Sequence, residues 1–322
     1  MAAIDPIIDP PAGPPTELPG ARPKPVRRAV DGILLLDKPA GYTSNQALSQ
    51  AKRLLAAKKA GHTGSLDPLA TGLLPLCFGE ATKVSQYLLD ADKRYHSVFR
   101  LGQSTNTFDA EGEVTAERPV NVTRAQVEQA ILRFTGAIEQ IPPMYSAVKK
   151  EGRPLYELAR AGIEIERAPR RVTVFEFRVL SLQGDALEVE IHCSKGTYVR
   201  ALAHDLGEVL GCGAHVAKLT RTGMGAFKIA DAITLEALMR MPDAVARATK
   251  LMPADRALDH LPVVELSRNA AYYFWQGQPV TGPRGKAFPA ARIYEAGGRF
   301  LGIGELGVDG QVLPKRLMRP SA

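Results

Sequence analysis

The chain has 322 residues, a length that suits about two domains of roughly 150 residues each. Apolar residues make up 45% of it and charged residues 23%, which is the composition of an ordinary globular protein. No apolar run approaches the roughly 18 residues of a membrane-spanning helix, so the sequence excludes a helical membrane protein. The 41 Lys and Arg residues exceed the 34 Asp and Glu residues by 7, an excess that permits a polyanionic partner without proving one.

The three cysteines, Cys77, Cys193 and Cys212, are widely separated. Their spacing fits neither a disulfide framework nor a zinc site, and no set of His and Cys residues has the spacing of metal ligands. We therefore expect buried thiols, no bound metal and a cytoplasmic location, where thiols stay reduced.

The N-terminal residues, 1–30, are predicted to form a disordered tail. Eight prolines in its first 25 positions prevent a helix, and few large apolar residues offset the entropy of ordering it. Ordered structure is expected to begin with a short apolar strand over 32–37, followed by a turn and a helix. Ser44 is the expected N-cap of that helix, and apolar residues recur at helical spacing from Ala47 to Leu55.

The elements that follow are predicted from the periodicity of their apolar residues. In chain order they are a helix over 82–89, a strand over 94–101, a helix over 123–134, an extended stretch over 141–146, paired strands over 172–180 and 186–193, a helix over 197–210 and a hairpin over 216–229.

The chain changes character near residue 255. From Asp259 to Leu317, nine glycines separate short β-prone runs, which predicts a small all-β unit with its own core. Within it, residues 302–307 match the letters of the dinucleotide-binding pattern GxGxxG. That pattern needs a strand before it, a helix after it and an acidic residue about 20 positions on. Too few residues follow, so we interpret these glycines as turn residues.

The segment richest in chemical groups is 61–72, Gly-His-Thr-Gly-Ser-Leu-Asp-Pro-Leu-Ala-Thr-Gly. Its glycines allow close approach of the backbone to a ligand. Asp67 precedes Pro68, a residue suited to the first position of a helix. From these residues alone, Asp67 is predicted to be an N-cap, and a catalytic role is the alternative.

Four further blocks accompany this segment in a fixed order: Asp37–Ser44 before it, and after it Asp92–Tyr95, Pro143–Lys149 with Gly152 and Arg153, and Ser194–Arg200. Together the five blocks, spread over roughly residues 31–250, resemble bacterial TruB-type tRNA pseudouridine-55 synthases. Any one block would be a weak signal, and their common order makes the resemblance specific. It implies an α+β fold with a mixed, largely antiparallel sheet and flanking helices, the pseudouridine synthase fold, plus a small C-terminal β-barrel similar to a PUA domain.

The resemblance implies that Asp67 is the nucleophile. Its carboxylate would attack a flipped-out uridine at C6 of the base or at C1′ of the ribose. The glycosidic bond then breaks, and the uracil turns in the pocket and is rejoined through C5. Arg200 matches the family's arginine partner, whose guanidinium would keep the carboxylate charged. This chemistry needs no redox step, so we expect no cofactor and no metal.

The resemblance also implies which residues contact the substrate. Tyr95 matches the tyrosine that stacks on the target base and helps to remove the C5 proton, and a core tyrosine on a strand is the alternative. Tyr198 and Leu219 match positions that line the uridine pocket, although a core role explains Leu219 nearly as well. His62 matches a histidine that stacks against the displaced nucleotide.

The implied organisation is a catalytic domain over 31–254, with a thumb-like insertion over about 123–167, and a PUA-like RNA-binding domain over 255–322. The expected substrate is uridine 55 in the T stem-loop of tRNA. No membrane and no obligatory protein partner are expected, so the chain would act as a monomer. The basic residues expected to meet phosphates near the thumb are Lys149, Lys150, Arg153, Arg160, Arg167, Arg170 and Arg171.

Two alternatives remain beside this interpretation. One is a guide-RNA-dependent relative of archaea and eukaryotes, against which the thumb-like insertion argues, because it suits an enzyme that recognises its RNA alone. The other is an RNA-binding or RNA-chaperone module in which modification is incidental. Activity on a bare tRNA transcript tests the first, and the Asp67→Asn variant tests the second.

Overall fold

The structure of the chain is a computed structural model that describes residues 27–146, 148–150, 152–163 and 165–319. Most of the tail expected at 1–30 lies outside these residues. The side chains outside the description include those of Lys149, Lys150 and Arg160, three of the expected phosphate contacts.

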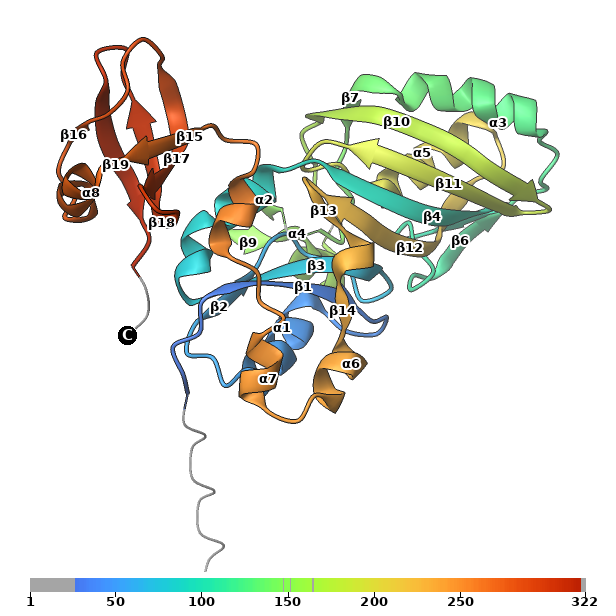
Figure 1. Ribbon diagram of the computed structural model, residues 1–322. Coiled ribbons are helices and arrows are strands. Elements are labelled where there is room, and N and C mark those ends of the chain that lie inside the picture. The colour runs from blue at the N-terminus through green and yellow to red at the C-terminus, as the bar shows by residue number, and fades with distance from the viewer. Residues whose placement is uncertain (1–26, 147, 151, 164, 320–322) are drawn as a thin grey trace, which may run out of the picture.

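A ten-stranded mixed sheet forms the centre of the molecule, in the order β14-β1-β3-β12-β4-β11-β10-β7, with β2 beside β3 and β13 beside β12 (Figure 1). Its neighbours pair antiparallel except at β1–β14 and β3–β12, which confirms the predicted fold class. Its strands are β1 (Gly32–Lys38), β2 (Ala60–His62), β3 (Thr71–Phe78), β4 (Lys93–Leu101), β7 (Gly136–Gln140), β10 (Arg170–Gln183), β11 (Ala186–Cys193), β12 (Ala214–Met224), β13 (Phe227–Lys228) and β14 (Ile233–Thr234).

Helices flank this sheet, and no helix among the described residues is long and apolar enough to cross a membrane. The α-helices are α1 (Ser44–Leu54), α2 (Ser85–Asp90), α3 (Arg124–Ile131), α4 (Leu155–Arg160), α5 (Val199–Val209), α6 (Leu235–Arg240), α7 (Ala244–Ala248) and α8 (Arg268–Trp275). Four 3₁₀ segments accompany them in the described chain: η1 (Gly79–Val84), η2 (Leu132–Phe134), η3 (Ile229–Asp231) and η4 (Ala254–Leu258). The helix predicted over 82–89 is therefore split between η1 and α2.

The N-cap of α1 is Thr43 rather than Ser44, so that prediction is wrong by one residue. The Thr43 hydroxyl accepts a hydrogen bond from the backbone N–H of Gln46, and the Gln46 side chain accepts one from the backbone of Thr43, which makes a complete capping box. Ser44 is instead the first helical residue. Its Oγ accepts from the backbone N–H of Leu66 at 2.8 Å and donates to the Leu66 carbonyl at 3.2 Å. The hydroxyl next to the cap therefore fixes the loop that carries Asp67.

Both faces of the central strands are buried, which explains why β1 and β3 are continuous apolar runs rather than alternating ones. Leu34 and Leu36 of β1 point into the core that α1, α3 and α5 cover. Ile33 and Leu35 point to the opposite face, into a second core completed by η1, α2 and η4. The sheet thus separates two apolar cores, one against each of its faces.

A second sheet of five strands, in the order β15-β17-β18-β19-β16, packs with α8 around a core of its own (Figure 1, red). Its strands are β15 (Val263–Leu266), β16 (Val280–Thr281), β17 (Phe288–Glu295), β18 (Arg299–Leu306) and β19 (Gln311–Leu317). Ile303 and Met318 from this region join the second core of the large sheet, and Lys83 Nζ donates to the Leu317 carbonyl at 2.9 Å. The two sheets are therefore packed together.

The GxGxxG letters lie on β18 and not at the start of a helix. Gly302 has φ +138°, and a Cβ there would lie 1.9 Å from the carbonyl oxygen of Arg316 on β19. The glycine permits close strand pairing, so a dinucleotide-binding role does not apply.

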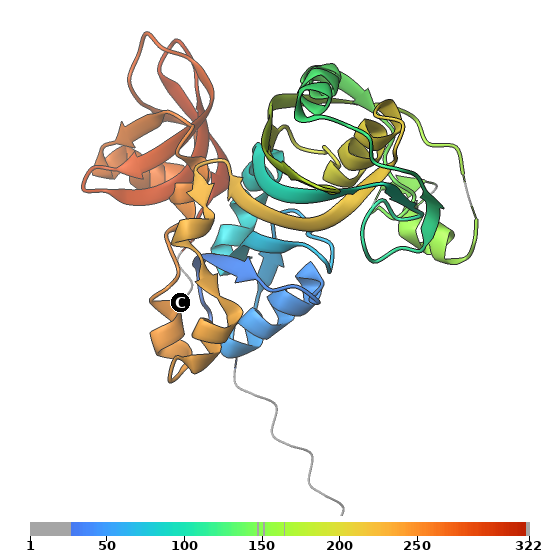
Figure 2. The same cartoon turned by 90° about the vertical axis from the view of Figure 1, so that its right-hand side faces the viewer.

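Two small hairpins project from the large sheet, β5 (Gln103–Thr105) with β6 (Val114–Glu117) and β8 (Lys149–Lys150) with β9 (Arg153–Pro154). The second hairpin runs into α4, within the expected thumb. Figure 2 shows α4 and the C-terminal sheet at opposite sides of the molecule in that view.

Candidate active site

Asp67 lies in the loop between β2 and β3, and no helix follows it. The backbone N–H of Ala70 donates to the Asp67 carbonyl at 3.1 Å, closing a single turn. The chain then enters β3 at Thr71, which pairs in parallel with Thr220 of β12. The prediction that Asp67 caps a helix is wrong, because sheet pairing captures the chain before a second helical turn can form.

Arg200, in the first turn of α5, faces Asp67 across this loop. Its Nε lies 3.0 Å from Oδ2 of Asp67. The Arg200 side chain is only 7% exposed, whereas that of Asp67 is 42% exposed. The pair therefore has a buried cationic half and an anionic half that is open to a cavity.

Three further groups fix the Arg200 guanidinium. Nη1 lies 3.3 Å from Oδ2 of Asp109 and donates to the Thr107 carbonyl at 3.0 Å. Nη2 donates to the Tyr145 carbonyl at 2.7 Å. A guanidinium held at all its nitrogens cannot turn away from Asp67, and its planar fork suits such multiple contacts.

Asp109 is a site residue that the sequence interpretation missed. Its side chain is 4% exposed, and the Thr107 hydroxyl donates to its Oδ1 at 2.6 Å. Phe108 between them has φ +64°, a left-handed conformation that is uncommon for an aromatic residue. Its ring stacks on His204 of α5 with 3.9 Å between ring centroids. This contact fastens the β5–β6 loop to the helix that carries Arg200.

The charges around Asp67 act on its carboxyl in opposite directions. Burial has the largest effect and raises the pKa of Asp67, and the Asp109 carboxylate raises it further. The charges of Arg200 and Lys38 lower it, but the net result is a raised pKa. Lys38 lies fully buried beneath the loop, where Nζ donates to the carbonyls of Pro39 at 2.9 Å and Tyr42 at 2.6 Å. Burial lowers the Lys38 pKa to about 8. A carboxylate that is partly desolvated, yet held by fixed cations, has the surroundings that a carboxylate nucleophile needs.

The open side of Asp67 faces a cavity of about 330 Å³, within the range of about 300–1,000 Å³ typical of small-molecule sites. The structure brings five of the six predicted site residues to its wall: Asp67, Tyr95, Tyr198, Arg200 and Leu219. The sixth, His62, lies half-buried on β2 and is not part of the wall. Burial, together with the charge of Arg221, lowers the pKa of His62, so this imidazole is neutral at pH 7.

Two cations in this wall were not singled out from the sequence. Lys93 is buried, and Nζ donates to the Leu89 carbonyl at 2.7 Å. Arg221 is 1% exposed, and its Nε donates to the Leu73 carbonyl at 2.7 Å. Both lie close to Tyr95, whose pKa burial raises to about 12. The phenol of Tyr95 is therefore neutral at pH 7.

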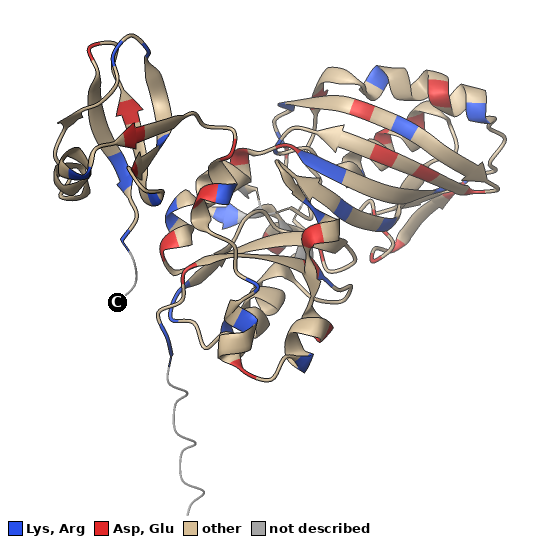
Figure 3. Cartoon of the chain, in the orientation of Figure 1, with Lys and Arg blue, Asp and Glu red and all other residues tan. Residues whose placement is uncertain are grey.

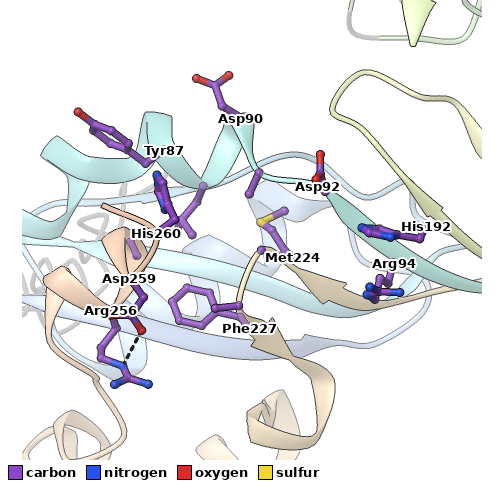
Figure 4. Close-up of a pocket in the computed structure, with 15 residues that line it drawn as sticks. Tyr87, Asp90, Asp92, Arg94, His192, Met224, Phe227, Arg256, Asp259 and His260 are labelled. Carbon is purple, nitrogen blue, oxygen red and sulfur yellow. Dashed lines mark ion pairs between the residues drawn. The ribbon is translucent and has the colours of Figure 1, made fainter. Parts of the chain in front are cut away.

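A second cavity, of about 490 Å³, is larger but has a different character (Figure 4). Arg94 of β4 lines this cavity, whereas its neighbour Tyr95 lines the first. Because successive side chains of a strand point to opposite faces, the two cavities lie on opposite sides of β4. Two of the three acids in the larger cavity pair with exposed cations: Asp259 lies 3.5 Å from Arg256 and Asp90 lies 2.7 Å from Lys195. The smaller cavity holds the Asp67 carboxylate with its buried arginine partner and is the candidate active site.

Charges on the outer face of the large sheet are intermixed rather than gathered by sign (Figure 3). Glu190 pairs with Arg178, and Glu188 lies 2.8 Å from His96. Because these charges neutralise one another across neighbouring strands, this face does not form a basic surface.

Family models together match most of the chain. "TruB family pseudouridylate synthase (N terminal domain)" matches residues 52–199. "tRNA pseudouridylate synthase B C-terminal domain" matches 200–259, and "Pseudouridine synthase II TruB, C-terminal" matches 262–318.

Curated relatives agree with these matches. The tRNA pseudouridine synthase B of Pseudomonas aeruginosa (strain UCBPP-PA14) is 57% identical over 304 residues, which cover 93% of this chain and 99% of that protein. The tRNA pseudouridine synthase B of Stutzerimonas stutzeri (strain A1501) is 54% identical over 302 residues, again 93% and 99% of the two chains.

Two solved structures share the fold. A chain in the crystal structure of a Cbf5-Nop10-Gar1 complex superposes with a TM-score of 0.69 at 28% identity, covering 90% of this chain and 85% of that one. A chain in the structure of an H/ACA RNP bound to a substrate RNA containing 2′-deoxyuridine gives 0.68 at 25% identity, with the same coverage. The sequence resemblance is thereby confirmed, and the chain belongs to the TruB family of pseudouridylate synthases.

Proposed function

We propose that this chain converts uridine 55 in the T loop of tRNA to pseudouridine by base flipping and covalent catalysis by Asp67. The observation that carries the proposal is the Asp67–Arg200 ion pair at the mouth of a base-sized cavity. The curated relatives are named as tRNA pseudouridine synthases, which supports tRNA as the substrate.

In the proposed reaction, an ionised oxygen of Asp67 forms a bond to C1′ of the ribose or to C6 of the base. The bond between C1′ and N1 breaks, the uracil turns within the cavity, and C5 bonds to C1′. The bond between the Asp67 oxygen and the substrate breaks in turn, which returns the free carboxylate. C5 then loses its proton and N1 gains one, so the product is an isomer of the substrate. Arg200 keeps the free carboxylate ionised before the attack and holds the Asp67 side chain in orientation.

The other wall residues receive the everted base. Tyr95 presents an aromatic face on which uracil stacks, a contact worth about 1–3 kcal/mol per base. Tyr198 and Leu219 close the cavity around the base. His62, outside the wall, stacks against the nucleotide that the target base leaves behind.

Two parts of the chain are proposed to bind the rest of the tRNA. Residues 31–254 form the catalytic domain, and its thumb, at about 123–167, grips the T arm with Arg153, Arg167, Arg170 and Arg171 close to phosphates. Residues 255–322 form a PUA-like RNA-binding domain. The C-terminal sheet with a core of its own supports this division.

The purified chain incubated with an unmodified tRNA transcript, without other RNA or protein, tests this proposal. Pseudouridine mapped by chemical labelling is expected at position 55 and nowhere else in the transcript. A matched transcript with cytidine at position 55 is expected to bind with similar affinity and to remain unmodified.

Other outcomes identify the alternatives. Modification that appears only when a guide RNA is added would contradict the proposal in favour of a guide-dependent enzyme. Tight binding to the transcript without pseudouridine would favour an RNA-binding module. One of the structural neighbours is a chain of an H/ACA RNP bound to a substrate RNA and the other is a chain of a Cbf5-Nop10-Gar1 complex, which makes the first comparison necessary.

A further inference from the structure

Arg221 is a fully buried cation that forms no ion pair with a carboxylate of the described residues. It is the largest of the side chains that are under 2% exposed in the described chain. Its guanidinium donates to two backbone carbonyls, and its charge acts on the phenol of Tyr95 and on the neighbouring bases Lys38, His62 and Lys93. Burying a guanidinium without a carboxylate partner is strongly unfavourable, because the charge loses its hydration. A side chain that only filled space here would be apolar.

Arg221 is next to three segments around the active-site cavity. Nε donates to the Leu73 carbonyl on β3 at 2.7 Å, and an Nη2 bond of 3.3 Å reaches the Gly64 carbonyl in the loop that carries Asp67. The guanidinium also belongs to the residue opposite Tyr95 on β4, and its charge acts to lower the pKa of the Tyr95 phenol against the larger effect of burial. One planar group therefore connects the loop of the nucleophile to the tyrosine of the base site.

The sheet register places Arg221 for this task. Arg221 on β12 and Tyr95 on β4 are directly opposite each other in the antiparallel ladder. Side chains of opposed residues share one face of the sheet with Cβ atoms about 4.5–5.5 Å apart. On its other side, Arg221 pairs with Gly72 of β3. The position is therefore fixed by backbone hydrogen bonds on both sides and does not depend on substrate.

We propose that Arg221 is a positioning residue for the isomerisation: it holds the phenol of Tyr95 and the loop of Asp67 in one fixed relation, so that the stacked base meets the carboxylate in a reactive geometry. The inference rests on the proposed function of Asp67 and Tyr95. It assigns Arg221 no contact with the RNA backbone, so its loss affects turnover rather than tRNA binding.

Arg221→Met tests the inference, because methionine keeps the length and removes the donors and the charge. The expected result is a fall of about 10²-fold in kcat, the effect of misplacing reacting groups by about 1 Å, with KM for tRNA changed less than threefold. Arg221→Lys keeps a charge and one donor but lacks the fork. It is expected to recover part of kcat, and it replaces the methionine variant if that variant does not fold.

Arg247→Met is the matched control. Arg247 also donates to backbone carbonyls, those of Leu238 and Leu54 at 3.0 Å and Met241 at 2.7 Å, but it lies outside the cavity wall. Its loss is expected to lower Tm and leave kcat per folded molecule unchanged. This separates positioning from general support of the fold.

A double-mutant comparison adds a second readout. If Arg221 acts through Tyr95, the two substitutions are not additive. Arg221→Met is then expected to lower the single-turnover rate less in a Tyr95→Phe background than in the wild-type chain. Wild-type kcat in both Arg221 variants, or a rise in KM at unchanged kcat, would overturn the inference. Either result would leave the proposed function standing, because the wild-type chain measured beside them tests that function by itself.

Discussion

The carboxylate of Asp67 and the guanidinium of Arg200 meet at 3.0 Å, and only the carboxylate is open to the cavity. The asymmetry follows from their elements: a short turn exposes Asp67, whereas α5 packs Arg200 into the core. A buried cation held by several acceptors keeps its place whatever happens to the carboxylate. In the proposed reaction, Arg200 would therefore stay in position while Asp67 forms and breaks its bond to the substrate.

Asp109→Asn is expected to lower kcat by about 10²-fold, because Arg200 loses a fixed anchor and Asp67 moves with it. The same change removes a negative charge that raises the pKa of Asp67. The low-pH limb of kcat, where the nucleophile becomes protonated, is therefore expected to move to lower pH.

A single-turnover pH profile measures both effects of Asp109→Asn. Asp185→Asn serves as control, because Asp185 lies in an exposed turn and pairs only with Arg100, at 3.2 Å, among the contacts described. A limb that moves to higher pH in the Asp109 variant would contradict the electrostatic account.

Asp67→Asn is expected to stabilise the fold at neutral pH. The folded-state pKa of Asp67 is raised above its ordinary value of 3.8, so ionisation costs folding free energy at every pH above the folded pKa. That cost fades as pH falls and is absent below the ordinary value, where the carboxyl is protonated in both states.

Thermal unfolding at several pH values checks this linkage. The Tm of Asp67→Asn should exceed that of the wild type at pH 7, and the two should converge near pH 4. A variant that is less stable than the wild type at pH 7 would mean that the attraction of Arg200 outweighs desolvation.

Gly72→Ala is expected to lower the free energy of unfolding by at least about 2 kcal/mol, from strain and overpacking together. Gly72 has φ +98°, and a Cβ there would lie 2.4 Å from the carbonyl oxygen of Arg221. Gly184→Ala isolates the strain, since Gly184 has φ +60° with no atom within 4 Å of the added carbon, and about 1 kcal/mol is expected there. Urea unfolding measures the free energy of unfolding of both variants. An equal decrease in the two would show that β12 moves enough to accommodate the added methyl group.

Arg170→Gln is expected to weaken tRNA binding and to reduce the slope of log Kd against log salt by about 1. Arg170 is exposed at the start of β10, and its charge acts on the phenol of Tyr198 at the cavity wall. Arg178→Gln on the same strand is the control, because Arg178 pairs with Glu190 on the outer face. Binding titrations at several salt concentrations measure both, and equal losses of affinity would argue against a thumb-side RNA path.

Local pattern was sufficient to predict much of the fold. The strands around Tyr95 and Cys193 and the helix around Val127 have regular apolar periodicity and formed as expected. The N-caps were harder, because Thr43 and Ser44 are equally good acceptors and only the path of the chain decides between them. Asp67 has the sequence context of an N-cap, but the pairing of β3 with β12 determines its structure.

Only those residues of the candidate active site that lie in recognisable sequence motifs could be predicted. Asp67, Tyr95 and Arg200 lie in recognisable blocks, whereas Asp109 and Arg221 have ordinary local contexts. Asp109 reaches the site because Phe108 stacks on α5, and Arg221 because β12 inserts between β3 and β4. Both depend on long-range pairing, for which a single sequence has no signal.

The most direct measurement for the central claim is the single-turnover rate of pseudouridine formation by Asp67→Asn on unmodified tRNA. The rate is expected to fall at least about 10⁴-fold, as for loss of a catalytic nucleophile, while Kd for tRNA stays within about threefold of the wild type, since the amide keeps the shape of the carboxyl group. A variant that binds tRNA and forms pseudouridine within tenfold of the wild-type rate would show that the covalent step does not pass through Asp67.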